Sequence, residues 1–571
     1  MKKRYLIPSC PNLLLAIFLG VSLLFCCTGC FEKASNEKQV SRQNNSEQLE
    51  NYIQEFVKFR RSGFSRELRT AEQYTIQANE LREWLKKLES IPREGLTLDQ
   101  DVDYRLIASD IKTNIARIER ERKWEKDPGL YIPFESINSI VGNKEITAEE
   151  KERRLQKAFE DVPQTIATAK ANLNRPAKFF YDRALDTLKL VLEFYRKEAR
   201  ECVEAMPTKD GKLKDAYTKA LASVEDYKKY LEEDIKSQAD GEMGIGRELY
   251  NYYLKETYMM DDDVDSLLRK GEQSFADTIQ LLEETASRLD PKKTWQELIK
   301  KNRKHHPTAD HLLSEWEKEI QRARQHVINK NLVIVPDGEK VVVVPTPPSR
   351  RDSSPFGLMS TPRPFSDSKL GTLVINPVDP DLPQALKEEL LSGHDYTFIS
   401  TIAPHETYPG HHLQALKVQE NPRIIRKLIG SSLFGEGWGL YTEELMYETG
   451  FFKNVGRTRL TQLRTRLWRA ARVILDAKLH TGKISYEDAR RFLEEKVLFE
   501  PSRSAGEVNM YVASPTYVIT YILGYFDIMK LRKEYKAKLG KDFSLLKFHE
   551  AMLKTGSLPT SILREVLLAE K

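Results

Sequence analysis

The sequence predicts a mainly α-helical fold with a small β-sheet next to the helix that carries the candidate active site. Apolar residues recur at three- and four-residue spacing over residues 49–330 and again from residue 383 onward, which is the pattern of amphipathic helices. Between these regions, residues 332–376 contain short runs of β-branched apolar residues, which favour strands. A motif with three histidines, residues 405–412, follows the last of these runs, so we expect the candidate site beside the sheet.

Residues 1–29 have the pattern of an export signal. Three basic residues, Lys2–Arg4, precede the apolar segment Leu13–Phe25, which is too short for a typical membrane-spanning helix. Thr28-Gly29-Cys30 resembles the cleavage site of bacterial lipoproteins, although Cys27 replaces the usual leucine. We therefore expect a lipid on Cys30 that attaches the exported protein to the bacterial cell envelope, on the periplasmic side of a membrane or at the cell surface. An ordinary signal peptide and an uncleaved anchor are the alternatives.

The segment after the leader, residues 30–48, is rich in Glu, Lys, Ser, Asn and Gln and predicts a polar tether. Beyond Cys30 the sequence has one cysteine, Cys202, so we expect no disulfide and interpret Cys202 as a small apolar core residue. The net charge of the 571 residues is +5, with charges of both signs interspersed. This composition gives no support for nucleic-acid binding.

Residues 49–330 predict a helical scaffold in which proline and glycine separate successive helices. The predicted helices are Leu49–Phe59, Glu67–Leu88, Asp103–Glu121, Ala148–Leu173, Ala177–Ala205, Leu213–Gln238, a run from Met243 to Met260, Asp263–Leu289 and Ser314–Ile328.

The strand signals come next. Leu332–Val335 and Val341–Val344 are apolar runs separated by Pro336-Asp-Gly338, which predicts a β-hairpin. Residues 345–364 are rich in proline, serine and arginine and predict an exposed loop. Gly371–Asn376 is a further short strand, so a small sheet should precede the histidine motif.

From Pro383 to the C-terminus the chain is predicted to be helical again, within a catalytic region that comprises residues 331–571. We expect this region and the scaffold to form one integrated unit over residues 49–571. Besides a helix through the histidine motif, the predicted helices are Leu386–Ser392, Phe434–Thr449, Arg457–Thr481, Tyr486–Glu495, Ser514–Tyr535, Leu545–Leu553 and Pro559–Leu568.

The histidine motif has the ligand types of a zinc site but an unusual spacing. A helix brings two histidines to one zinc most simply at positions i and i+4. Here His411 and His412 follow His405 at i+6 and i+7. On an unbroken helix the residue at i+6 points away from residue i, and the residue at i+7 lies about 10.5 Å from it along the helix axis, too far to share a zinc ion. Pro409-Gly410 predicts a bulge, which would return His411 to the face of His405 by absorbing two residues, or His412 by absorbing three. We prefer His411.

Three glutamates complete the candidate site. Glu406 follows the first histidine, where it would face the attacking water as a general base. Glu436 lies between two glycines on a predicted helix and is the best third ligand. Glu443 lies two helical turns further on, and is a candidate to hold a histidine ring. Taken singly, each of these residues would more often be a helix cap or a solvated side chain.

Longer motifs around these residues resemble the DUF885 family, a set of mostly uncharacterised bacterial proteins that are grouped with the zincin-like metallopeptidases, near the helical gluzincins. The resemblance covers about residues 50–566. The motifs that carry it are His405-Glu406-x-x-Pro409-Gly410-His411, Gly435-Glu436-Gly437-Trp438-x-Leu-Tyr441-x-Glu443, Arg472-Val-Ile-Leu-Asp476-x-x-x-His480 and Pro515-x-Tyr517-x-x-x-Tyr521-x-x-Gly524.

The resemblance implies a helical zincin fold and a zinc peptidase reaction. Zinc held by His405, His411 and Glu436 would activate water, and Glu406 would take its proton. His480 and Tyr521 are candidates to stabilise the oxyanion, or are buried core residues.

The same resemblance implies short peptides as substrates, within a deep cleft. The strand Leu373–Asn376 is a candidate to bind an extended peptide by edge pairing, or it simply closes the sheet. Four arginines of one helix could include a clamp for a substrate carboxylate, which would suit a carboxypeptidase or dipeptidase, or they are structural or solvated; they are Arg464, Arg466, Arg469 and Arg472.

Three hypotheses follow from the sequence. The first is a lipid-anchored zinc metallopeptidase that cleaves short peptides outside the cytoplasm. The second is a metal-dependent hydrolase of a different amide or an ester, because zinc-activated water does not by itself select the substrate. The third is a non-catalytic helical lipoprotein. The sequence gives no indication of oligomeric state.

Overall fold

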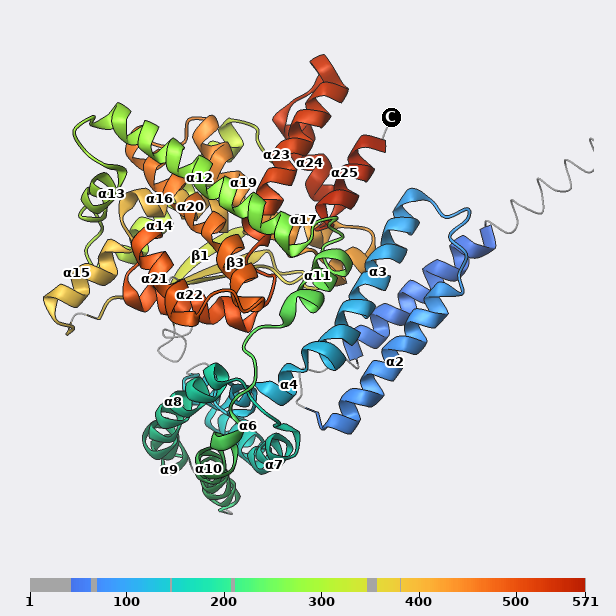
Figure 1. Ribbon diagram of the computed structural model, residues 1–571, viewed down its shortest axis with the longest axis vertical. Helices are drawn as coiled ribbons and strands as arrows, with labels where there is room; N and C mark the ends of the chain where they lie inside the picture. The colour runs from blue at the N-terminus through green and yellow to red at the C-terminus, as the bar shows by residue number, and fades with distance from the viewer. Residues whose placement is uncertain are drawn as a thin grey trace, which may run out of the picture.

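The computed structural model describes residues 43–62, 69–143, 146–206, 211–346, 357–379 and 381–569. These residues form a mainly helical fold with one three-stranded sheet, which confirms the predicted fold class (Figure 1). The leader 1–29 and the candidate lipid site Cys30 lie outside the described residues. Among the helices that the structure describes, none combines the length and the apolar character needed to cross a membrane.

The N-terminal part is helical where the sequence predicts it, with shifted boundaries. The first helix covers residues 43–62 and so includes part of the predicted tether. Thr70 and Thr97 cap the N-termini of α2 and α3. In each case the threonine side chain accepts a hydrogen bond from the backbone N–H of a glutamine three residues later, and the glutamine side chain accepts one from the threonine N–H. The helices are α2 (Ala71–Glu89), α3 (Leu98–Ala116), α4 (Lys123–Lys126), α5 (Glu135–Val141), α6 (Ala148–Glu160), α7 (Val162–Asn172), α8 (Lys178–Phe194), α9 (Arg200–Glu204), α10 (Lys212–Tyr230), α11 (Gly246–Glu256), α12 (Val264–Leu289), α13 (Trp295–Arg303) and α14 (Leu312–Asn329).

Short π- and 3-10 segments extend several of these helices or connect them. They are η1 (Arg117–Glu121), η2 (Pro128–Tyr131), η3 (Tyr195–Ala199), η4 (Leu231–Ile235) and η5 (Lys236–Gln238).

The C-terminal part is also helical, and it includes two helices that were not predicted, α18 and α22, of which α22 begins at Pro501. Pro501 suits this position because the first helical residue has no partner for its backbone N–H. The elements are α15 (Gln384–Ser392), α16 (Tyr396–Glu406), α17 (His411–Glu420), α18 (Ile424–Leu428), α19 (Ser432–Glu448), α20 (Val455–His480), α21 (Tyr486–Val497), α22 (Pro501–Ala513), α23 (Thr520–Leu539), η7 (Gly540–Asp542), α24 (Leu545–Thr555) and α25 (Thr560–Ala569).

The sheet has the order β1-β3-β2, with β1 (Lys340–Pro345) parallel to β3 (Leu370–Ile375) and β2 (Leu358–Ser360) antiparallel to it. The predicted hairpin is therefore wrong, because residues 332–335 form no strand. Side chains of α24 form hydrogen bonds with the backbone of this segment instead. The Leu332 carbonyl accepts a 2.7 Å bond from His549 Nδ1, and the Ile334 N–H donates to Glu550 Oε1 at 2.8 Å.

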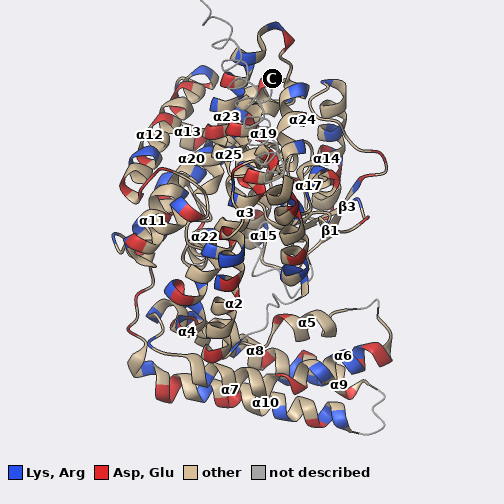
Figure 2. Cartoon of the chain, turned by 90° about the vertical axis from the view of Figure 1, so that its right-hand side faces the viewer, with Lys and Arg blue, Asp and Glu red and all other residues tan. Residues whose placement is uncertain are grey.

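The largest hydrophobic core joins the two parts of the sequence. It contains Val102 and Leu254 from the N-terminal helices together with Phe398, Trp438 and Ile522 from α16, α19 and α23. A separate core lies within residues 131–239, and these helices form the lower body in Figure 1. Packing therefore shows no boundary near residue 330. Lys and Arg are interspersed with Asp and Glu along the helices (Figure 2).

Candidate metal centre

His405 and His411 lie at facing ends of two helices. His405 is in the last turn of α16, and His411 is the first residue of α17. Between them the helix is interrupted rather than bulged, so the predicted continuous helix is wrong, although the predicted convergence of the two histidines is correct. Gly410 permits this connection, because a Cβ there would lie 1.8 Å from the His405 carbonyl oxygen. The two imidazole ring centres are 4.9 Å apart.

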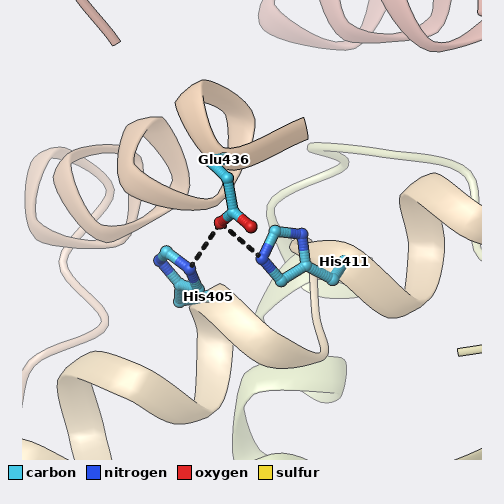
Figure 3. A group of neighbouring side chains, drawn as sticks. All are labelled: His405, His411 and Glu436. Atoms are coloured by element: carbon cyan, nitrogen blue, oxygen red, sulfur yellow. Dashed lines mark ion pairs between the residues drawn. The ribbon is translucent and has the colours of Figure 1, made fainter. Parts of the chain in front are cut away.

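Glu436 brings a carboxylate between the two rings from α19 (Figure 3). Its Oε2 lies 3.3 Å from His411 Nε2 and 3.9 Å from His405 Nε2. The candidate ligand atoms of all three residues lie within 4.8 Å of one another. The structure thus brings together the three metal ligands that the sequence predicts.

Glycines of α19 make this approach possible. A Cβ on Gly439 would lie 2.7 Å from His405 Nε2, so this position must be free of a side chain. A Cβ on Gly437 would lie 2.6 Å from the Gly524 Cα, where α19 crosses α23. Gly437 and Gly439 therefore allow α19 to pack closely against α23 and against His405.

Glu443 fixes the orientation of His405. The His405 Nδ1–H donates to Glu443 Oε1 at 2.9 Å, and Glu443 Oε2 accepts from Thr465 Oγ1 at 2.9 Å. With Nδ1 protonated, Nε2 carries the lone pair and faces Glu436. The predicted supporting role of Glu443 is confirmed.

His412 points away from this group, which decides between the two candidate second ligands. Its Nε2 lies 2.9 Å from Glu339 Oε2, and the whole side chain is buried. Glu339 also accepts hydrogen bonds from Arg324 and Tyr408. His412 is thus part of a buried polar cluster behind the site, and His411 is the candidate ligand.

The three ligand residues and Glu406 line one cavity of about 670 Å³. Its wall also includes Met359 of β2 and Glu507 of α22, a helix that sequence reasoning missed. In the described part of the chain, no hydrogen bond or ion pair engages the Glu406 carboxylate, so it is available to a substrate or to water.

Two tyrosines cover the site from the α23 side. Tyr521, a predicted site residue, lines the cavity, and its ring stacks on His405 with centres 6.3 Å apart. Tyr517 was not singled out, although it belongs to the same sequence motif. Its hydroxyl donates to Glu436 Oε1 at 2.5 Å. Tyr517 lies in the turns before α23, and the predicted helix from Ser514 gave no reason to direct it toward Glu436.

The charges at the centre stabilise one another. Burial lowers the pKa of His411, but the carboxylates of Glu436 and Glu406 outweigh burial and raise this pKa to about 9. Burial raises the pKa of Glu436, but His411 and His405 outweigh it and lower this pKa to about 2. Burial, together with Glu436, raises the pKa of Tyr521, so its hydroxyl stays protonated and able to donate.

His480, the other predicted oxyanion residue, does not line the cavity. Its Nε2–H donates to the Tyr511 carbonyl at 3.0 Å, and only 1% of the residue is exposed. Burial lowers its pKa to about 4, so the ring is neutral. The structure therefore assigns His480 to the core below the site, and we withdraw it as a catalytic candidate.

Two further predictions change with the structure. The strand proposed for edge pairing, Leu373–Asn376, belongs mostly to β3, which is the central strand with both edges paired, so it cannot bind a peptide. The edge strand next to the cavity is β2.

Of the four arginines, Arg469 and Arg472 line the cavity. Arg464 instead donates to the Val497 carbonyl, and Arg466 packs over Tyr525 and Phe526.

The donor set fits a zinc ion. Two imidazole nitrogens and one carboxylate oxygen converge, as in catalytic zinc sites with three protein ligands. Glu436 Oε2 is buried and has no hydrogen-bond partner among the described residues, so its lone pairs face only the two rings. A cation bound by all three residues would satisfy this oxygen.

Comparisons with known proteins agree with the fold. A model of the family "Bacterial protein of unknown function (DUF885)" matches residues 66–567. A presumed lipoprotein of unknown function from Shewanella oneidensis has a solved structure with a TM-score of 0.76 and 22% identity, over 92% of this chain and 99% of its own. For a presumed lipoprotein from Colwellia psychrerythraea the TM-score is 0.75 and the identity 20%, over 93% and 99% of the two chains. No curated protein matches the sequence.

Proposed function

The chain belongs to the DUF885 family of bacterial proteins of unknown function, and we propose that it is a zinc-dependent hydrolase that cleaves short peptides. The observation that carries the proposal is the convergence of His405, His411 and Glu436 within 4.8 Å, in the cavity that Glu406 also lines. Two histidines and one glutamate are a ligand set of catalytic zinc, which leaves a position open for water or substrate.

Zinc in this site would supply Lewis-acid activation of water and of the substrate carbonyl. The residues of the chain have defined parts in the reaction. Glu443 holds His405 in the tautomer that presents Nε2 to the cavity. Tyr517 holds Glu436 through its Oε1 and leaves Oε2 toward the histidines.

Glu406 is the general base in this proposal. It adjoins His405 in sequence, lines the same cavity, and has a carboxylate that no other described side chain occupies. It takes the proton of the attacking water and passes it to the leaving amine. Tyr521 is the candidate to donate a hydrogen bond to the oxyanion, because its hydroxyl stays protonated and its ring contacts His405.

The edge of the sheet favours a peptide over other amides and esters. β2 is an edge strand of only three residues, and Met359 at its centre lines the cavity. An extended peptide could pair with the open side of this strand and so place a backbone carbonyl near the three ligand residues. An ester or a small amide would make no use of this edge.

We also propose that the protein is exported and anchored through a lipid on Cys30. The leader pattern supports this, and so do the two structural relatives, which are presumed lipoproteins. Full-length protein expressed in a bacterium should sediment with membranes and carry a fatty-acid mass on its N-terminal peptide. The Cys30→Ala variant should lose that mass and its membrane association, and unchanged sedimentation would contradict the anchor.

The hydrolase proposal is tested by metal content and peptide digestion together. Wild-type protein should bind one zinc per chain and cleave members of a short-peptide library. The Glu406→Gln variant should keep the zinc but lose at least about 100-fold in kcat, because general-base catalysis accelerates a reaction by about 10²–10⁴-fold. Glu420→Gln, on the exposed end of α17, is the matched control and should behave as wild type. Hydrolysis that survives in Glu406→Gln, or that needs no metal, would reject the proposal.

A further inference from the structure

Two arginines of α20 line the cavity, and the proposed mechanism gives neither of them a role. Arg469 and Arg472 are three residues apart, on one face of the helix, and each is 3% exposed. Their guanidinium groups pack on the Trp468 ring, with Cζ atoms 4.0 and 4.1 Å from its centre. Stacking of this kind holds the planar groups in fixed positions at low dielectric.

Arg472 shares its acidic partner, Glu507, with two other hydrogen-bond donors. Glu507 lies 3.1–3.3 Å from Arg472 Nε and Nη2. The same Glu507 Oε2 also accepts from Trp468 Nε1 at 2.9 Å and from the Tyr511 hydroxyl at 2.8 Å. Among the described residues, Arg472 Nη1 has no hydrogen-bond partner.

The guanidinium of Arg469 has weaker hydrogen-bond and ion-pair contacts than that of Arg472. Its nearest carboxylate oxygen, Glu443 Oε1, lies 3.5 Å from Nη2 and already accepts a bond from His405. This separation exceeds the 2.7–2.9 Å or so of a strong charge-assisted bond. Its Nη1 donates to the Thr465 carbonyl at 3.3 Å, and within the described structure its Nε has no partner. Burial lowers the pKa of Arg469, which agrees with incomplete pairing.

These arginines lie one aromatic ring away from the candidate metal ligands. The Tyr521 ring stacks on His405 at 6.3 Å, and its centre is 4.4 Å from Arg472 Cζ and 5.8 Å from Arg469 Cζ. Successive Cα atoms of a peptide are about 3.8 Å apart, so one or two residues span this width. A terminal carboxylate could reach the arginines while the preceding carbonyl lies at the ligands.

We propose that Arg469 and Arg472 bind the C-terminal carboxylate of the peptide, so that the enzyme removes residues from free carboxyl ends. This inference rests on the proposed peptidase function and adds its substrate class. A carboxylate supplies the acceptor oxygens that the two guanidinium groups lack, and its fork-shaped recognition by arginine is geometrically specific. Tyr517 lines this cavity and also a second cavity of about 650 Å³.

The first test changes the substrate and leaves the protein intact. Zinc-loaded wild-type protein is given one short peptide with a free C-terminal carboxylate and the same peptide with a C-terminal amide. We expect kcat/KM for the acid to exceed that for the amide by about tenfold or more, the usual value of a hydrogen bond to a charged group. Equal cleavage of both, abolished by chelation, would overturn this inference while the hydrolase proposal stands. Cleavage of neither peptide, nor of any library member, would reject the hydrolase itself.

The second test assigns the preference to these residues. Arg469→Lys and Arg472→Lys keep the charge beside Glu443 and Glu507 but lose the fork. Each should raise KM for the acid by about tenfold and so reduce the ratio of kcat/KM between the acid and the amide. Arg532→Lys, whose arginine pairs with Glu448 outside the cavity, is the matched control. If the preference for the acid persists in both arginine variants with wild-type circular dichroism, the assignment is wrong.

Discussion

At the scale of single residues, Glu443 connects the candidate metal centre to the body of the protein. It is fully buried and contacts three groups: His405, Thr465 and the guanidinium of Arg469. A buried carboxylate is stable only when its oxygens are paired, and here each oxygen has a partner. The residue that orients the candidate metal ligand is therefore also the acidic neighbour of Arg469 in the cavity wall.

This role predicts the effect of Glu443→Gln. Glutamine can still accept a bond from His405 Nδ1, but it removes the negative charge that raises the basicity of the ligand. We expect zinc affinity to fall by about 10–100-fold, as is usual for such supporting residues, with the fold retained. Isothermal titration with zinc measures this.

The matched control is Glu444→Gln, the next residue of α19. Glu444 pairs with Arg459 and Gln462, away from the cavity, and its loss should leave zinc affinity unchanged. If both variants bind zinc as the wild type does, Glu443 does not tune the site.

The pKa of His411 predicts how zinc binding depends on pH. This pKa is raised to about 9, so at neutral pH zinc must displace a proton from the ring. The affinity should therefore rise by about tenfold per pH unit from pH 6 to pH 8, with one proton released per zinc bound. Titrations in buffers of different ionisation enthalpy count the proton. A pH-independent affinity over this range would contradict the raised pKa.

The residue types at the site were predictable from the sequence, and their directions were predictable only in part. His405, Glu406 and Glu436 occupy recognisable motif positions. The sequence favoured His411 over His412, and the contact of His412 with Glu339, which is 73 residues away in the chain, supports this choice. The sequence left His480 open between an oxyanion role and the core. Its partner is a carbonyl on α22, a helix that the sequence did not reveal, and this contact favours the core.

At the scale of elements, the site depends on how closely α19 crosses α23. This contact brings Tyr517 and Tyr521 over Glu436 and His405. The contact needs glycine on both helices, since a Cβ on Gly437 would lie 2.6 Å from the Gly524 Cα. Small residues at this crossing therefore serve the geometry of the centre as well as the packing.

We predict that Gly437→Ala separates the two helices. The backbone of Gly524 cannot yield as a side chain would, so the variant should lose about 1–3 kcal/mol of unfolding free energy and most of its activity. Gly435→Ala is the control, because its nearest neighbour would be Gln414 Oε1 at 4.0 Å. It should keep activity and gain up to about 1 kcal/mol from helix propensity. Denaturant unfolding of both variants measures the difference, and equal stabilities would contradict the steric account.

Helices were predictable at this scale, and strand pairing was not. Periodicity locates α12 and α20 to within two residues at each end. Apolar β-branched runs did not distinguish the strand β1 from residues 332–335, of which only Leu332 and Val333 are buried in the core. This segment forms no strand, and side chains of α24 bond to the Leu332 carbonyl and the Ile334 N–H. The order β1-β3-β2 likewise depends on contacts between distant segments, which local patterns do not encode.

At the scale of the whole molecule, the largest core joins both parts of the chain, whereas the residues that line the cavity of the candidate site all lie between 357 and 557. The largest core includes α3 and α11 from the N-terminal part together with α16, α19 and α23. The adjoining second cavity is lined by residues of both parts, including Glu121, Tyr253 and Tyr517. The N-terminal helices are therefore more than a support, because they form one side of the space next to the candidate metal centre.

The central claim is that His405, His411 and Glu436 together hold a catalytic zinc ion. Anomalous diffraction at the zinc absorption edge, from crystals grown with zinc, tests it most directly. The account predicts one strong peak per chain at about 2.0–2.2 Å from Nε2 of each histidine and from the Glu436 carboxylate. A peak at other residues, or no peak between these three side chains in crystals that contain zinc, would contradict it.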